Sequence, residues 1–121
     1  MARKNWHIKV EGDTLTLARR LPARFDFAAT AVISGGAALR RGRMARQVRQ
    51  DMWRALQTLR GFAPAVSVRV VGDDLEVIAG GGVAGAFPKA HCEAIVADVL
   101  SDPVRRARWI AHATREEADH A

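Results

Sequence analysis

Alternating apolar and polar residues predict a β-hairpin near the start of the chain, over residues 5–20. The alternation runs from Trp6 to Val10 and from Thr14 to Leu17, with Gly12-Asp13 as the turn between them. A period of two places the apolar side chains on one face of the hairpin. A third strand is expected from Phe25 to Ile33, where both faces are largely apolar, as in a strand inside a sheet.

A period of 3.6 residues then predicts a long helix that starts near Ala37 and ends before Gly61. Its apolar residues fall within about 120° around the helix axis, the width of a buried stripe. This stripe consists of Met44, Ala45, Val48, Met52, Ala55, Leu56 and Leu59. Gly42 weakens the start of the helix, so the residues before it are expected to fray or to form a separate turn.

A second hairpin is predicted from Ala65 to Val71 and from Leu75 to Ala79. The glycine-rich residues Gly80 to Gly85 after it are expected to form a flexible loop. They match the letters of the dinucleotide motif G-x-G-x-x-G, but the preceding strand closes a hairpin instead of starting a βαβ unit. We therefore expect no dinucleotide cofactor.

Two further helices complete the pattern. One starts at Pro88 and places Cys92 on its buried stripe, and the other starts at Asp102-Pro103 and ends near His112. The order β-β-β-α-β-β-α-α predicts an α+β fold, with about five mainly antiparallel strands and helices packed on one face of the sheet. Residues 1–113 are expected to form a single domain, and the polar residues 114–121 a frayed tail.

Basic charge is concentrated in the first half of the 121-residue chain. Residues 1–60 hold 13 of the 19 Lys and Arg residues but 4 of the 13 Asp and Glu residues. Such an excess favours a polyanionic partner. No apolar run reaches the roughly 18 residues that a membrane helix needs, and the N-terminal residues lack the apolar segment of a secretory signal. We therefore expect a cytoplasmic protein without a membrane partner.

The sequence offers no clear catalytic centre. Its carboxylates, including Asp51, are scattered over predicted turns and helix surfaces, and no paired acid and base stand out. His91 and Cys92 are neighbours on a helix, so their side chains point about 100° apart and cannot form a base–nucleophile pair. The histidine spacing suits no metal, and a single cysteine builds no zinc site. We expect no catalytic residue, no metal and no cofactor.

Ser34, Gly35 and Gly36 stand at the predicted start of the long helix. Free amide groups and the positive end of the helix dipole favour an anion at such a place. These residues are therefore a possible anion-binding loop, although the glycine pair also has a simpler explanation, because it lets the strand turn tightly into the helix.

Trp53 lies among arginines on the polar face of the long helix instead of on its apolar stripe. Cations beside an aromatic ring can hold phosphates while a base stacks on the ring. The predicted contact residues are Arg40, Arg41, Arg43, Arg46, Arg49, Trp53 and Arg60. The alternative is that Trp53 packs against another part of the fold, such as Trp109 on the third helix, or against a second copy of the protein.

The third helix repeats the combination of arginine and tryptophan on a smaller scale. Arg105, Arg106 and Arg108 are expected to form a solvated face beside Trp109, or one basic patch with the long helix if the two helices meet.

Three functions remain open from the sequence. The first is a non-enzymatic module that binds nucleic acid or another polyanion through the arginine and tryptophan residues. The second is a module that binds a protein partner or forms a homodimer through the same face. The third is a small phosphate-ligand binder or enzyme that uses Gly35-Gly36 and Gly80 to Gly85.

Overall fold

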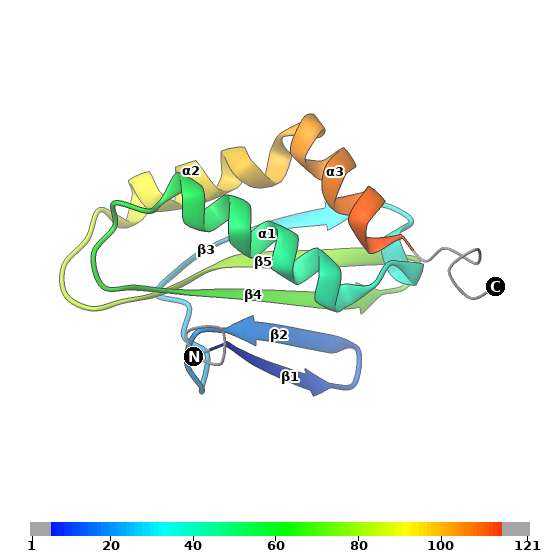
Figure 1. Ribbon diagram of the computed structural model, residues 1–121, viewed down its shortest axis with the longest axis horizontal. Coiled ribbons are helices and arrows are strands. Elements are labelled where there is room, and N and C mark those ends of the chain that lie inside the picture. Colours follow the sequence, from blue (N-terminus) through cyan, green and yellow to red (C-terminus); the bar gives the residue numbers. More distant parts are fainter. Residues whose placement is uncertain (1–5, 115–121) are drawn as a thin grey trace.

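The computed structural model describes residues 6–114, which form one antiparallel sheet with three helices on one of its faces (Figure 1). The elements are β1 (His7–Glu11), β2 (Thr14–Ala18), β3 (Phe27–Ile33), the short 3-10 turn η2 (Gly36–Ala38), α1 (Arg41–Ala55), β4 (Phe62–Val71), β5 (Asp74–Val83), α2 (Lys89–Ser101) and α3 (Pro103–Ala113). The sheet has five strands in the order β1-β2-β4-β5-β3. This architecture confirms the predicted α+β fold. Of the predicted frayed tail, 114–121, all but Thr114 lies outside the described residues.

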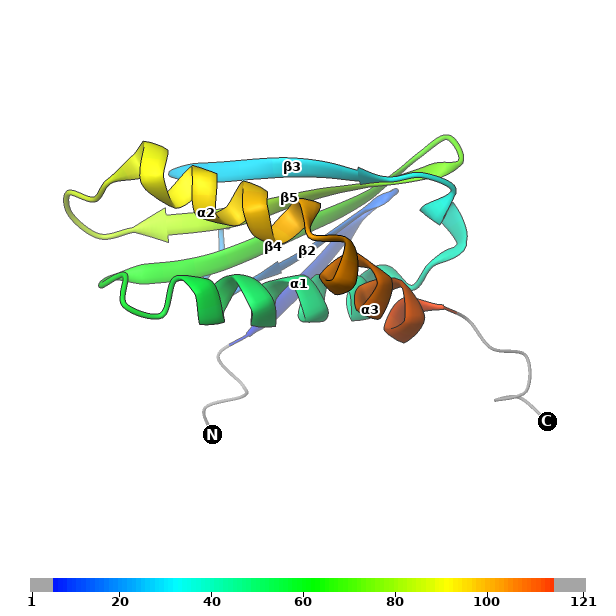
Figure 2. The ribbon, with the colours of Figure 1, turned by 90° about the horizontal axis from the view of Figure 1, so that it is seen from above.

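The hydrophobic core lies between the sheet and the helices. Leu15 and Leu17 of β2 stand opposite Val68 and Val66 of β4, and all four side chains are buried. Seen from above, α1 and α2 run across the same face of the sheet, and α3 packs against α1 (Figure 2). No helix among residues 6–114 is long and apolar enough to cross a membrane.

The predicted apolar stripe of α1 faces this core. Met44, Val48 and Met52 are fully buried, whereas Ala55, at the end of the helix, is exposed. The arginines on the opposite face are therefore held toward solvent by the burial of the stripe.

β1 lies at the edge of the sheet, outside the area that the helices cover (Figure 1). Ile8 and Val10 are 45% and 54% exposed, although they pair with the buried Leu17 and Leu15 of β2. The predicted apolar face of this hairpin therefore exists, but only its β2 half is covered.

The start of the long helix differs from the prediction. Gly36–Ala38 form the separate turn η2, and α1 begins only at Arg41, after Arg40 in an extended conformation. The Ala37 amide donates a hydrogen bond to the Asp73 carbonyl group, which fixes η2 to the turn between β4 and β5. A separate turn before Gly42 was one of the two expected outcomes.

The predicted end of the helix before Gly61 was wrong, because α1 ends at Ala55. The chain turns at Leu56, and the Leu59 amide donates to the Leu56 carbonyl group over 2.9 Å. Both leucines still pack against the core, so helical spacing of apolar residues continues beyond the helical hydrogen bonds. The spacing of apolar residues therefore predicted which side chains pack against the core, but not where the helix ends. Because α1 ends at Ala55, Arg60 lies outside the helix.

The predicted flexible loop from Gly80 to Gly85 was wrong for its first residues, because β5 continues to Val83. A Cβ atom at Gly80 would lie 2.0 Å from the Phe27 carbonyl oxygen, and one at Gly81 would lie 2.3 Å from the Ala63 carbonyl oxygen. The glycines therefore allow β3 and β4 to approach β5 closely.

Candidate functional site

Trp53 is 49% exposed, on the solvent side of α1. This confirms the prediction that its ring stands away from the apolar stripe. The alternative in which Trp53 packs against Trp109 was wrong, because Trp109 is 1% exposed and belongs to the core on the α3 side of α1. A large ring remains accessible at the surface.

Trp6, which the sequence had not singled out for a site, lies beside the predicted arginine strip. The Cζ atom of Arg49 lies 4.3 Å from the centre of the Trp6 ring, and that of Arg19 lies 5.6 Å from it. Cations at such distances are attracted by the electron-rich face of an indole. The sequence did contain a sign of this contact. The alternation places Trp6 on the same face as Ile8 and Val10, and these two residues pair with the strand that α1 covers.

Arg49 is held in a poor environment for a cation. Its side chain is half-buried, and its Nε atom is buried with no hydrogen-bond partner among the described residues. Burial, together with the neighbouring charge of Arg46, lowers the pKa of Arg49 from its ordinary value. Buried polar atoms are normally paired. Because the Nε atom is closed to solvent, an anion would have to meet the remaining part of the half-buried guanidinium group, whose positive charge it would balance.

The arginines around Trp6 and Trp53 have no ion-pair partner in the described part of the chain. Within residues 6–114, Arg19, Arg20, Arg46 and Arg49 form no salt bridge. Arg46 and Arg49 are one turn apart on α1, and Trp53 is one turn after Arg49. We call Arg19, Arg46, Arg49, Trp6 and Trp53 the arginine–tryptophan cluster.

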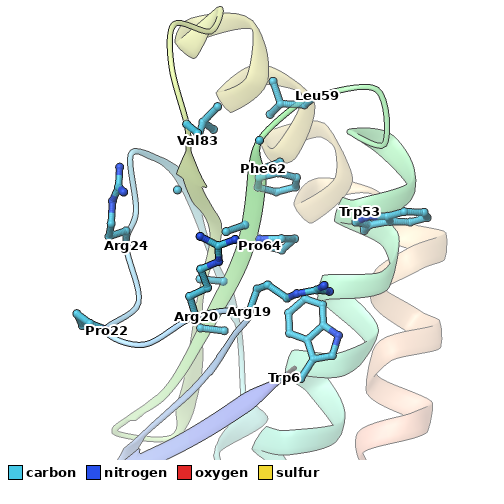
Figure 3. A pocket seen from close by; sticks show the side chains of 16 residues that line it. Trp6, Arg19, Arg20, Pro22, Arg24, Trp53, Leu59, Phe62, Pro64 and Val83 are labelled. Carbon is cyan, nitrogen blue, oxygen red and sulfur yellow. The ribbon is translucent and has the colours of Figure 1, made fainter. Parts of the chain in front are cut away.

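A pocket of about 450 Å³ adjoins the cluster at the end of the sheet. β2 ends at Ala18, opposite Ala65, and the Arg19 amide still donates a hydrogen bond to the Pro64 carbonyl group over 3.1 Å. Before Pro64, Phe62 and Ala63 at the start of β4 pair only with β5. The pocket lies along this unpaired part of β4, between the loop 19–24 and the end of α1. Figure 3 shows Arg19 beside Trp6, with Phe62 and Pro64 along β4.

The described residues that line the pocket are aromatic, apolar or basic, with no acidic side chain among them. The aromatic and basic residues are Trp6, Arg19, Arg20, Arg24, Trp53 and Phe62. The arginines can hold anionic groups, and the rings offer flat apolar surface. The pocket can therefore take a ligand that is both planar and negatively charged.

Asp26 links the loop 19–24 to the end of β5. Its carboxylate accepts hydrogen bonds from the Val83 amide over 2.8 Å and from Arg24 over 2.5 Å. The hydrogen bond from Val83, and then the charge of Arg24, hold the pKa of Asp26 below its ordinary value. Arg24 is thus the pocket arginine whose charge is already balanced within the protein.

The remaining predicted contact residues do not join the cluster. Arg40 and Arg41 lie at the start of α1, about 18 Å along the helix axis from Trp53. Arg41 donates a hydrogen bond to the Gly12 carbonyl group. Arg43 is exposed on α1, and Arg60 is exposed in the connection to β4.

The predicted anion-binding loop is occupied by contacts within the chain. The Gly35 amide donates to the Asp74 carboxylate over 2.9 Å, and Gly35 has the left-handed φ of +68° that glycine adopts readily. Ser34 lies before η2, which begins at Gly36 and is not continuous with α1. An anion at Gly35 would have to displace a carboxylate.

The arginines of α3 serve the fold. Arg108 pairs with Asp51 of α1, and Trp109 Nε1 donates to the same carboxylate over 2.7 Å. Arg106 donates to the carbonyl groups of Leu100 and Val32. Sequence reasoning placed Asp51 among surface carboxylates, but it is 6% exposed between α1 and α3.

Comparison with protein-family models, with curated protein sequences and with solved structures found no match to this chain. Within the described residues, no three His, Cys, Asp or Glu side chains are grouped so that they could hold a metal ion.

Proposed function

We propose that this protein is a non-enzymatic module that binds nucleic acid through the arginine–tryptophan cluster. The observation that carries the proposal is Arg49, a half-buried cation stacked on Trp6 with an unpaired Nε atom and no salt bridge among residues 6–114. A phosphate group supplies the missing negative charge and accepts hydrogen bonds from the guanidinium group.

Exposed aromatic rings distinguish nucleic acid from other polyanions. Trp53 stands one helical turn from Arg49 and is 49% exposed. A base can stack on such a ring while neighbouring arginines hold the phosphates on either side of it. Polyphosphate or an acidic peptide would use the charges but leave the ring unused. A cytoplasmic location, where nucleic acid is accessible, belongs to this proposal.

Anisotropy of a labelled oligonucleotide at several salt concentrations tests the proposal. Affinity should fall steeply as salt rises, because binding releases counterions from the phosphates. Arg46→Gln combined with Arg49→Gln should weaken binding at least about tenfold, through the loss of two phosphate contacts. Arg54→Gln is the matched control, since Arg54 is exposed on α1 but lies about 140° around the helix from Arg49.

Two results would contradict the proposal. One is the absence of oligonucleotide binding at low salt. The other is equal competition by inorganic polyphosphate at the same phosphate concentration, which would make the protein a general polyanion binder.

A second candidate function is self-association through β1. This edge strand exposes Ile8 and Val10 beside Trp6, and a free strand edge can pair with that of a second copy. Sedimentation should then show a dimer that Val10→Lys converts to a monomer. A monomer at every protein concentration would exclude this candidate.

A further inference from the structure

We infer that the pocket at the end of the sheet is a subsite for one unpaired nucleotide, so that the protein selects single-stranded over double-stranded nucleic acid. The inference rests on the proposed nucleic-acid function and names the form of nucleic acid that the site takes. DNA and RNA strands share the chemistry concerned, a planar base joined to a phosphate.

The shape of the pocket favours a single nucleotide. Its volume of about 450 Å³ lies within the range of small-ligand sites. It is recessed just beyond the end of β2, where Phe62 and Ala63 of β4 have no strand partner on that side among the described residues. Bases inside a duplex are stacked on both faces and cannot enter a recess, whereas an unpaired base can turn into it.

The walls of the pocket divide between aromatic and cationic groups. Phe62 is half-buried, and its ring centre lies 5.5 Å from that of the buried Phe27, so its position is fixed by the core. Trp53 and Trp6 stand on the α1 and β1 sides. Arg19 and Arg20, both exposed and without a salt bridge among the described residues, stand where the chain leaves β2.

The arginine strip on α1 leads into the pocket. Arg46, Arg49 and Trp53 occupy successive turns and span about 10 Å along the helix axis. A strand whose phosphates contact Arg46 and Arg49 therefore arrives at Trp53, which belongs to both the strip and the pocket wall. The surface and the recess form one continuous site.

The same walls predict tolerance of sequence. The described lining residues include no amide, hydroxyl or carboxylate side chain, and their side-chain hydrogen bonds come from the arginines and from the indole N–H groups of Trp6 and Trp53. Arginine and tryptophan only donate, so these side chains cannot accept a hydrogen bond from a base amino group or from a ribose 2′-hydroxyl group. Affinities for oligo(dT), oligo(dA) and oligo(rU) should therefore agree within about fivefold.

Competition between single and double strands tests the inference. The probes are a labelled oligo(dT) and oligo(rU) of about 12 nucleotides and a blunt duplex of the same length, at one salt concentration. The single strands should bind at least about tenfold more tightly, although the duplex carries more charge.

Pocket variants separate the recess from the general charge of the surface. Trp53→Ala should weaken single-strand binding about 5- to 100-fold by removing a stacking surface, and weaken duplex binding by much less, because a duplex offers no unpaired base to stack on the ring. Because Trp53 is half exposed, the variant should fold, which circular dichroism verifies. Arg69→Gln is the control, since Arg69 pairs with Glu76 on the sheet face away from the helices.

The outcomes distinguish this inference from the proposed function. Equal binding of single and double strands, with Trp53→Ala as tight as the unaltered protein, would overturn the subsite while nucleic-acid binding stands. No binding of either form would overturn both. Tighter single-strand binding that Trp53→Ala abolishes supports both.

Discussion

Two pairs of arginine and tryptophan flank α1, and the fold uses them in opposite ways. On the α3 side, Arg108 and Trp109 share the buried carboxylate of Asp51. On the β1 side, Arg49 stacks on Trp6 and forms no salt bridge with any residue from 6 to 114, and Trp53 stays exposed. The same residue types therefore stabilise the fold where an acid completes them, and on the other side they form the surface that we propose for binding.

The difference lies in the partner and not in the charge. A cation that is paired and hydrogen-bonded inside a protein is satisfied, whereas a desolvated cation without a partner is costly. On the β1 side, Arg49 is such a desolvated cation. Its burial and the charge of the neighbouring Arg46 lower its pKa. An external anion would offset that cost.

The largest effect should come from breaking the complete pair. Asp51→Ala removes the acceptor of Trp109 Nε1 and the partner of Arg108, and should lower the free energy of unfolding by about 2–4 kcal/mol. The estimate is below that for a fully buried pair because the Arg108 side chain is 45% exposed. Urea titration measures the change. Asp98→Ala, at an exposed position of α2, should shift stability by less than about 0.5 kcal/mol.

Exchanging one arginine on each side of α1 should have opposite consequences. Arg49→Gln should weaken oligonucleotide binding about five- to tenfold and change stability by less than about 1 kcal/mol, because relief of desolvation offsets the lost stacking on Trp6. Arg108→Gln should lower stability and leave affinity unchanged. Affinity lost equally in both variants would show that total charge, and not the cluster, sets binding.

The salt dependence of binding sharpens the same contrast. Each phosphate contact to a single strand contributes about 0.7 to the slope of log affinity against log salt. Arg49→Gln should reduce the slope by about that amount. Arg108→Gln should not, because Asp51 already neutralises Arg108. An unchanged slope in Arg49→Gln would remove Arg49 from the phosphate contacts.

The smallest expected effect concerns Asp26, the partner of the pocket residue Arg24. Since folding lowers the pKa of Asp26, its contribution to stability is present above the unfolded value and is lost as pH falls below about 4. Urea midpoints at pH 6 and pH 3 should therefore differ more in the unaltered protein than in Asp26→Asn. Identical pH dependence in the two proteins would contradict this role for the Val83 hydrogen bond.

Much of the fold and one side of the site follow from residue spacing. The exposure of Trp53 was predictable because successive helical residues point about 100° apart. Since Met52 is buried on the apolar stripe, its neighbour Trp53 points away from that stripe. The contact of Arg49 with Trp6 was not, since these residues meet only because β2 pairs with β4 beneath α1 and brings β1 alongside. Long-range strand order decides that contact.

The errors have similar physical causes. Leu56 and Leu59 pack against the core and are spaced as in a helix, although α1 has already ended at Ala55. Their spacing therefore predicted a helix that is too long. Gly80 and Gly81 resembled a loop because glycine is common in loops, but here they make room for neighbouring backbone. Asp51 was taken for a surface carboxylate because its partners lie on another helix.

The most direct test of the difference between the two sides of α1 is the indole N–H region of an NMR spectrum during titration with an unlabelled single strand. The protein has three tryptophans, Trp6, Trp53 and Trp109, so each should give one signal, assigned by Trp→Phe variants. We predict that the Trp6 and Trp53 signals shift with added strand while that of the buried Trp109 stays in place. Stationary Trp6 and Trp53 signals at saturating oligonucleotide, or a Trp109 signal that moves as far as theirs, would contradict a binding surface on the β1 side of α1.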